Sequence, residues 1–242
     1  MTVRLGLSGD AGAIRAGEAE LAAFLGRLVR WDKTAAVRLR SDAGEPALGV
    51  FGQPPFGGVL AVKSVALGGP AVAAPVDATV SAGELLEALA GAAQSGEFTV
   101  PASVTGPAWA GLLPPRGGWH REAVLEPDLV REAAARTVAE FRTRTEALVP
   151  EQRTRAEMDA LAEELWTRPL AGPVRGVTLR LVHAAHALGF LQPGAGAGAG
   201  DEQLAVLTAG PWMRLRTGYG SVAMRSASAA SGLTVSPRPA SV

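Results

Sequence analysis

Four arginines in the last third of the chain are the residues best suited to binding chemistry: Arg175, Arg180, Arg214 and Arg216. A guanidinium group is planar and carries five N–H donors, so it pairs well with phosphate and carboxylate oxygens. In the stretch WMRLRTGYG polar and apolar residues alternate, which predicts a strand with Arg214 and Arg216 on one face and Trp212 beside them. We therefore expect these four arginines to form a polyanion-binding surface.

Charge is distributed unevenly along the 242 residues, although the formal net charge is zero. Residues 1–167 hold 16 Lys and Arg against 21 Asp and Glu, and residues 168–242 hold 7 against 2, which together give the 23 of each sign. A basic end beside an acidic body is typical of a segment that binds a polyanion or docks a partner. The same pattern would arise in a structural domain whose arginines pair with acids of the first half.

A second group of residues is a candidate protein interface: Trp109, Leu112, Leu113 and Trp119, in a stretch rich in proline and glycine. Tryptophan is prominent among the residues that dominate binding energy at interfaces. If buried, the same residues would instead form a strap that packs the two halves of the chain together. The strap interpretation is favoured, because large apolar loops are rarely left exposed on monomers.

Signatures of metal binding and catalysis are weak. His183 and His186 lie three residues apart on a predicted helix, close enough to share a metal ion, but the chain has no cysteine and its third histidine, His120, lies in a distant loop. The glycines of LGLSGDAGAIRAG match neither phosphate-binding fingerprint, and no G-x-S-x-G elbow occurs. We therefore predict no metal, no cofactor and no catalytic residue, and favour a non-catalytic role over an enzyme of unrecognised type.

The first half of the chain has the patterns of an antiparallel sheet with helices. Residues 16–31 place apolar side chains at helical spacing, and three β-like runs follow at 35–40, 48–51 and 59–67, separated by turn formers. Ser81 and Glu84 form a capping box, which predicts that a helix begins there after a Gly/Pro/Ala connector at 68–78. Residues 98–100 are a further candidate strand.

The second half is predicted to be helical and then β. One helix runs from Pro127 to about Leu148, a second follows the capping box of Thr154 and Glu157, and a third covers about residues 175–188. A PGAGAGAG linker at 193–200 precedes strands at 204–208, 212–217 and 221–224. This order of elements resembles the winged helix-turn-helix family. The resemblance implies that the third helix would enter the DNA major groove and that the β-ribbon would lie along the phosphates.

These patterns predict an α+β protein with three parts. An antiparallel sheet with helices covers residues 1–120, a helical region that ends in a small β-ribbon covers 121–228, and a flexible tail covers 229–242. The alanine, glycine and arginine content, with two lysines, is typical of a GC-rich bacterial genome. The N-terminus lacks a signal-peptide pattern and no apolar run approaches a membrane span, so we expect a cytoplasmic protein without membrane contact.

The function that we predict is protein–protein interaction, as an adaptor or within an assembly, with a second copy of the chain or another protein as the partner. The uneven charge, the Trp-rich loop and the lack of catalytic signatures motivate this prediction. DNA binding or regulation through the winged-helix-like segment is the alternative.

Overall fold

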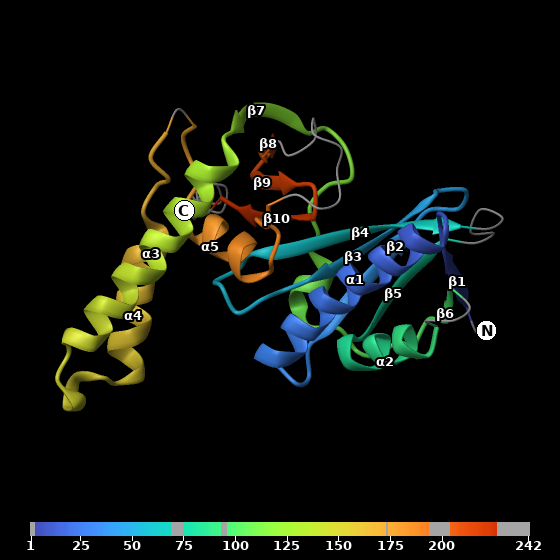
Figure 1. The fold of residues 1–242 in the computed structure, drawn as a ribbon, viewed down its shortest axis with the longest axis horizontal. Coiled ribbons are helices and arrows are strands. Elements are labelled where there is room, and N and C mark those ends of the chain that lie inside the picture. The colour runs from blue at the N-terminus through green and yellow to red at the C-terminus, as the bar shows by residue number, and fades with distance from the viewer. Residues whose placement is uncertain (1–2, 69–74, 93–95, 173, 194–203, 227–242) are drawn as a thin grey trace, which may run out of the picture.

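The protein is described by a computed structural model over residues 3–68, 75–92, 96–172, 174–193 and 204–226 (Figure 1). In these residues ten strands form one antiparallel sheet, in which eight run in the order β5-β2-β3-β4-β10-β9-β8-β7, while β1 pairs with β4 and β6. The α+β class is therefore confirmed. The strands are β1 Arg4–Leu7, β2 Ala36–Ser41, β3 Ala47–Gly52, β4 Leu60–Gly68, β5 Val76–Ser81, β6 Glu97–Thr99, β7 His120–Leu125, β8 Leu204–Ala209, β9 Trp212–Thr217 and β10 Gly220–Arg225.

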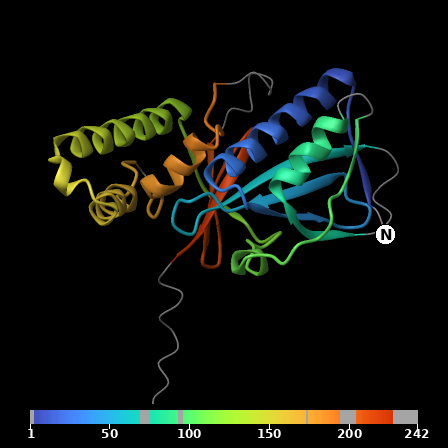
Figure 2. The same cartoon turned by 90° about the horizontal axis from the view of Figure 1, so that it is seen from below.

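The first half folds around the predicted helix and meander. Helix α1 (Ala11–Trp31) buries the predicted apolar stripe, and the alternating buried residues of β2 and β3 pack against it. The helix begins five residues before the predicted start, because the side chain of Asp10 accepts hydrogen bonds from the backbone N–H of Gly12 (3.0 Å) and Ala13 (2.8 Å). Helix α2 (Ala82–Ala92) lies beside α1 on the same face of the sheet (Figure 2).

Two similar units meet at the centre of the sheet. Each consists of a helical segment and a three-stranded meander, in the orders α1-β2-β3-β4 and α3-α4-α5-β8-β9-β10. The strands that precede them are not equivalent, because β1 pairs with β4 and β7 pairs with β8. The final strands β4 and β10 pair antiparallel, with Val62 opposite Ser221 and Leu60 opposite Ala223. The meanders β2-β3-β4 and β8-β9-β10 therefore run outward in opposite directions from this junction. Antiparallel pairing of equivalent elements is the arrangement that a local two-fold axis produces, so we interpret the units as an internal structural repeat.

The junction differs from the sequence-based expectation of a separate C-terminal ribbon. Strands β8 to β10 continue the N-terminal sheet through β4, so within the described residues they are not a free wing. Three strands were also not predicted. β1 lies in the glycine-rich stretch, the first half of β5 lies in the predicted connector, and β7 is an edge strand with mostly exposed side chains that is defined by its pairing with β8.

The second half contains the three predicted helices, α3 (Pro127–Ala147), α4 (Arg155–Thr167) and α5 (Leu179–Ala187). Helices α3 and α4 form an arm that extends away from the sheet (Figures 1 and 2). Two ion pairs join them: Arg144 lies 2.7 Å from Glu164, and Arg168 lies 2.9 Å from Glu140. Arg168 also lies 2.6 Å from Glu164, four residues before it. Hydrogen bonds from Arg144 and then Arg168 lower the pKa of Glu164 to about 2.

Helix α5 packs against the sheet and against α3, with Leu181, Val182, Ala184 and Ala185 buried. It therefore occupies the position in the second unit that α1 occupies in the first. Residues 69–74 of the predicted connector, 194–200 of the predicted linker and the whole tail at 229–242 lie outside the described residues. The predicted division into two parts, residues 1–120 and 121–228, stays a prediction. Strands from both parts belong to one sheet.

In both predicted capping boxes the hydroxyl accepts the expected backbone hydrogen bond. Thr154 directly precedes α4 and its hydroxyl accepts from the backbone N–H of Glu157 at 3.3 Å, while Ser81, the last residue of β5, accepts from Glu84 at 3.4 Å. Replacing Thr154 by Ala should lower the free energy of unfolding by about 1 kcal/mol, because an N–H at the start of α4 loses its acceptor. Urea denaturation measures this change. Thr143→Ala, at an exposed position inside α3, is the control, and an equal loss in both variants would contradict the capping role.

Candidate functional site

A segment without long helices or strands, residues 101–119, crosses the face of the sheet opposite α1; we call it the strap, and the face that it covers the strap face (Figure 2). It contains the short 3-10 helix η1 (Ala108–Gly111). The backbone N–H of Val104 donates to the carbonyl of Thr79 at 2.8 Å, and the Trp119 indole N–H donates to the Pro115 carbonyl at 2.9 Å. These bonds hold one end of the strap to β5 and fold the other end back on itself.

The predicted interface residues lie in this strap. Trp109, Leu113 and Trp119 are half-buried against a small core of Leu60, Trp212 and Ala223, which is separate from the main core under the helices. Leu112 is 51% exposed. Trp109, Leu113 and Trp119 thus cover the sheet on one side and remain partly accessible on the other, whereas Leu112 is exposed.

Arg214 and Arg216 also lie on the strap face. Leu215 between them is buried in the main core, so the alternation of β9 turns both arginines to the opposite side. The Nε of Arg214 donates to the Ser221 hydroxyl at 2.8 Å, and its guanidinium carbon lies 5.5 Å from the centre of the Trp119 ring, within the range of a cation–π contact. In the described part of the chain, neither arginine has a carboxylate within ion-pair distance.

The electrostatic environment of Arg214 is unfavourable for its charge. Burial, and to a lesser extent the neighbouring positive charge of Arg216, lowers the pKa of Arg214. An arginine stays protonated under such a shift, because its ordinary pKa is so high. The lowered pKa therefore indicates that the Arg214 guanidinium is partly removed from water and has no anion beside it to compensate its charge.

The other two predicted arginines lie elsewhere. Arg175 is exposed in the turn before α5, beside Gly176, which approaches the Met213 side chain on the helix-covered face. Arg180 is largely buried and lies 2.6 Å from Glu163. The structure therefore does not bring the four arginines onto one surface, because α5 packs on the face of the sheet from which Arg214 and Arg216 point away.

A hollow of about 240 Å³ lies between the strap and the sheet, next to Arg214. Its sheet side includes small residues, among them Gly49 and Ser64, and Pro114 and Pro115 of the strap border it. Two more guanidinium groups line it: that of Arg116, which pairs with Asp42, and that of Arg40, whose Nε lies 3.5 Å from Asp77. Three arginines thus border one hollow that is also lined by two acids: Asp42, which pairs with Arg116, and the exposed Glu45, for which no ion pair is found among the described residues.

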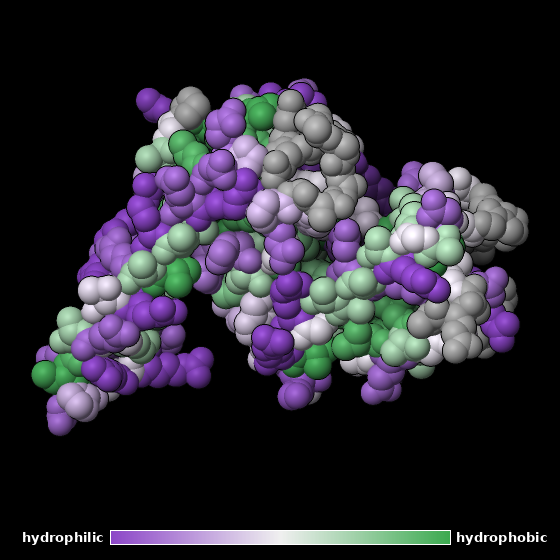
Figure 3. All heavy atoms as spheres, viewed as in Figure 1, coloured by the Kyte–Doolittle hydropathy of each residue, from purple (hydrophilic) through white to green (hydrophobic). Residues whose placement is uncertain are grey.

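Two further exposed arginines extend this basic surface. Arg121 lies opposite Leu207, which in turn lies opposite Arg214, and Arg225 lies opposite Trp212, so both share the strap face. No ion pair of either is found with the residues that the structure describes. By contrast, the space-filling view shows small and apolar residues gathered over α1 and α2, on the other face (Figure 3).

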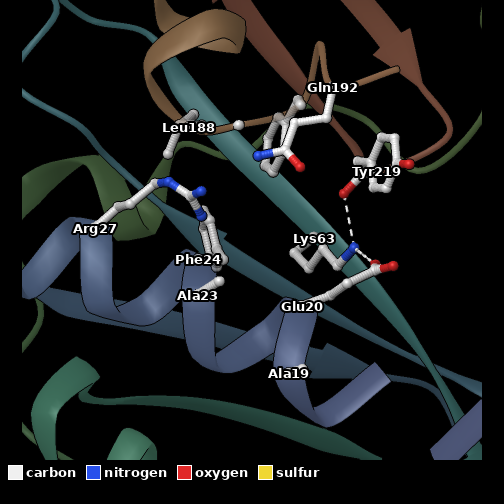
Figure 4. A pocket seen from close by; sticks show the side chains of 11 residues that line it. Ala19, Glu20, Ala23, Phe24, Arg27, Lys63, Leu188, Gln192 and Tyr219 are labelled. Carbon is white, nitrogen blue, oxygen red and sulfur yellow. Dashed lines mark hydrogen bonds and ion pairs between the residues drawn. The ribbon is translucent and has the colours of Figure 1, made fainter. Parts of the chain in front are cut away.

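A second pocket, of about 220 Å³, lies on that helix-covered face between α1, β4, the residues after α5 and the turn before β10 (Figure 4). At its edge Lys63, 5% exposed, contacts the Glu20 carboxylate and donates to the Tyr219 carbonyl at 2.8 Å. Sequence reasoning missed this pocket. The available signal was that Lys63 lies on the same side of its strand as Ala61 and Val65, both of which are buried.

Of the two helix histidines, His183 is a packing residue in this structure and His186 is exposed. The His183 ring stacks on Trp166 at 4.1 Å and meets the edge of Phe56 at 4.9 Å. Trp31 and Phe141 extend the contact, so that five rings connect the end of α1 to the arm. Within the described ranges no group of three or more His, Asp or Glu side chains is placed to hold a metal ion, and no helix is long and apolar enough to cross a membrane.

Two family models match the chain, one over about two fifths of it and the other over a little less than half. Residues 13–111 match a domain of unknown function, DUF8010, and residues 114–229 match another, DUF8185. No curated protein matches the chain.

Among solved structures, the chain is similar to the DNA polymerase III subunit beta from Pseudomonas aeruginosa, with a TM-score of 0.48 and 14% identity over 93% of this chain. It is also similar to a DNA polymerase sliding clamp from Pseudomonas aeruginosa with ligand, with a TM-score of 0.46 and 13% identity over 93% of this chain. The matches cover 64% and 63% of those two chains, so this chain spans less than two thirds of the length of either.

The buried histidine predicts a pH dependence of stability. Burial, and secondarily the charge of His186, lowers the pKa of His183 from 6.5 to about 4. The unfolded chain therefore takes up this proton at a higher pH than the native state. The free energy of unfolding should fall by at most about 3 kcal/mol as the pH decreases from about 6.5 to about 4.

His183→Phe retains a ring for the stack and removes the titration, so its stability should depend less on pH between about pH 7.5 and pH 5. Denaturant titrations at a series of pH values measure this dependence. His120→Gln, at an exposed position on β7, is the control and should keep the slope of the unsubstituted protein. An unchanged slope in His183→Phe would show that another group causes the dependence.

Proposed function

We propose that this protein is a non-catalytic adaptor that docks an acidic segment of a partner protein on its strap face. The observation that carries the proposal is the pairing of Arg214 with Trp119: a half-buried guanidinium lies against a partly accessible indole ring and has no carboxylate partner among the described residues. Arginine and tryptophan are the side chains most enriched among interface residues that dominate binding energy.

Electrostatics supports an acidic partner. The lowered pKa of Arg214 indicates that its charge is poorly compensated within the protein. A carboxylate from a partner would compensate it, and the planar guanidinium allows two parallel hydrogen bonds to such a group. Arg216 and Arg225, both exposed on the same face, add positive charge that would accelerate the encounter with an acidic segment.

The composition of the strap face favours a protein over a nucleic acid. Beside the arginines lie the partly accessible apolar side chains of Trp109, Leu112 and Leu113, a mixture that protein interfaces use at their centre. Surfaces that bind nucleic acid are more uniformly positive.

The winged-helix-like alternative has less support from the geometry. Helix α5 would have to enter the major groove, yet it packs against β9, β10 and α3 and buries four of its nine residues. Its arginine, Arg180, already pairs with Glu163. DNA binding through this helix would require it to leave the core.

Binding of a labelled acidic peptide that contains leucine and phenylalanine, followed by fluorescence polarisation, tests the proposal. The double variant Arg214→Gln/Arg216→Gln should weaken binding about tenfold or more, because the peptide carboxylates lose their main partners. Trp119→Ala should also weaken it. Binding should fall as salt is raised, since exposed charges are screened.

Arg175→Gln is the matched control, since Arg175 is exposed but does not lie on the strap face. Its affinity for the peptide should equal that of the unsubstituted protein. Equal weakening in this control would show a general effect of net charge. Tighter binding of a short duplex DNA than of the peptide, lost in the same double variant, would replace the adaptor proposal by nucleic-acid binding.

A further inference from the structure

We propose that the pocket on the helix-covered face binds a small organic carboxylate with an apolar body. The pocket holds about 220 Å³ and draws its lining from four separate parts of the chain: α1, β4, the residues that follow α5, and the turn before β10 (Figure 4). Figure 4 shows Arg27 from α1 and Gln192 from the segment after α5 on either side of the same space. This site lies on the opposite face of the sheet from the strap and does not depend on the proposed adaptor function.

The charges around the pocket leave one cation available. Lys63 is buried and compensated by Glu20, and the Tyr219 carbonyl accepts a second of its three N–H groups. Arg27 is half-buried, and among the described residues it forms no ion pair and no hydrogen bond. Two cations and one anion leave an excess of one positive charge, which matches a monocarboxylate. A phosphate ester carries about −1.5 to −2 at neutral pH and would be undercompensated.

The position of Glu20 is compatible with an anion near Arg27. In Figure 4 the Glu20 carboxylate lies on the far side of the Lys63 ammonium from Arg27, so the lysine separates it from the open space. The guanidinium fork of Arg27 offers two parallel donors to a carboxylate, and the Gln192 amide offers a further hydrogen-bonding group.

Two glycines allow the walls to approach closely. A Cβ at Gly189, where φ is +73°, would lie 2.6 Å from a terminal nitrogen of Arg27. A Cβ at Gly220, where φ is +154°, would lie 2.7 Å from the ring of Phe190. Any other residue at Gly189 would displace the guanidinium, so this backbone conformation is part of what positions Arg27.

The rest of the lining is apolar, with Ala23, Phe24, Leu188 and Phe190 around the space. The Phe24 and Phe190 rings are stacked at 5.9 Å and are 1% and 3% exposed, so this wall is rigid. An apolar wall beside one charged fork is the usual construction of a site for a small ligand with a single anionic group. The volume restricts the body to about the size of a phenyl ring or a short aliphatic chain.

The probes are benzoate and hexanoate, with benzamide and hexanamide as neutral counterparts of the same shape. We expect saturable binding of at least one carboxylate in the millimolar range, as its few atoms allow, measured by amide chemical-shift changes and by an increase in Tm. The amides should bind at least about tenfold more weakly, because they lack the charge that pairs with Arg27.

Arg27→Gln should lose at least about tenfold in carboxylate affinity, and Arg30→Gln, at an exposed position of the same helix that does not line the pocket, should lose none. Amide spectra of each variant without probe establish that the fold is kept. Absence of saturable binding by both carboxylates up to about 20 mM overturns the proposal. Equal binding of the amides, or an unchanged affinity in Arg27→Gln, also overturns it.

Discussion

The pairing of β4 with β10 is the interaction on which the rest of this structure depends. It joins two three-stranded meanders into one sheet, and a sheet with apolar side chains on both faces needs cover on both. On one face α1 and α5 lie over the two units and form the large core. On the other, Leu60, Trp212 and Ala223 come together only because β4, β10 and β9 are neighbours, and the strap covers them.

One face of the sheet is covered by helices and the other by the strap, and this difference determines where the polar side chains of the two candidate sites lie. Helices seal their face with closely packed aliphatic and aromatic side chains, and the pocket at Lys63 lies where α1, the end of α5 and the turn before β10 meet. The strap is narrow and rich in proline and glycine, so long side chains of the sheet extend past it to water. Arginine suits such positions, because its aliphatic stem covers apolar surface while its guanidinium stays accessible.

Local features of the fold could be predicted from the sequence, and long-range ones could not. The spacing of Leu21, Phe24 and Leu28 indicates α1, and the hydroxyl of Thr154 marks the start of α4, because both signals depend on residues within one or two turns. The β4–β10 junction joins residues about 160 positions apart, and no alternation of side chains specifies a partner at that distance. For the same reason β7 was not predicted, since four of its six side chains are exposed and its pairing with β8 defines it.

The same distinction between local and long-range features applies to the residues of the candidate sites. The alternation of β9 places Arg214 and Arg216 together, but the sequence does not indicate that Trp119 would lie against Arg214. Nor does it indicate that α5 and the turn before it would place Arg180 and Arg175 away from the strap face. Lys63 and Arg214, from neighbouring parts of one sheet, show two ways of holding a partly or fully buried cation. Lys63 has a carboxylate and a carbonyl, whereas Arg214 has a hydroxyl and an aromatic ring. Since a desolvated cation without an anion does not stabilise the native state through an ion pair, neutralising Arg214 removes little stability of that kind. Such a variant does lose the hydrogen bond to the buried Ser221 hydroxyl and the contact with Trp119, so its free energy of unfolding has to be measured together with its binding before a loss of binding is assigned to the interface.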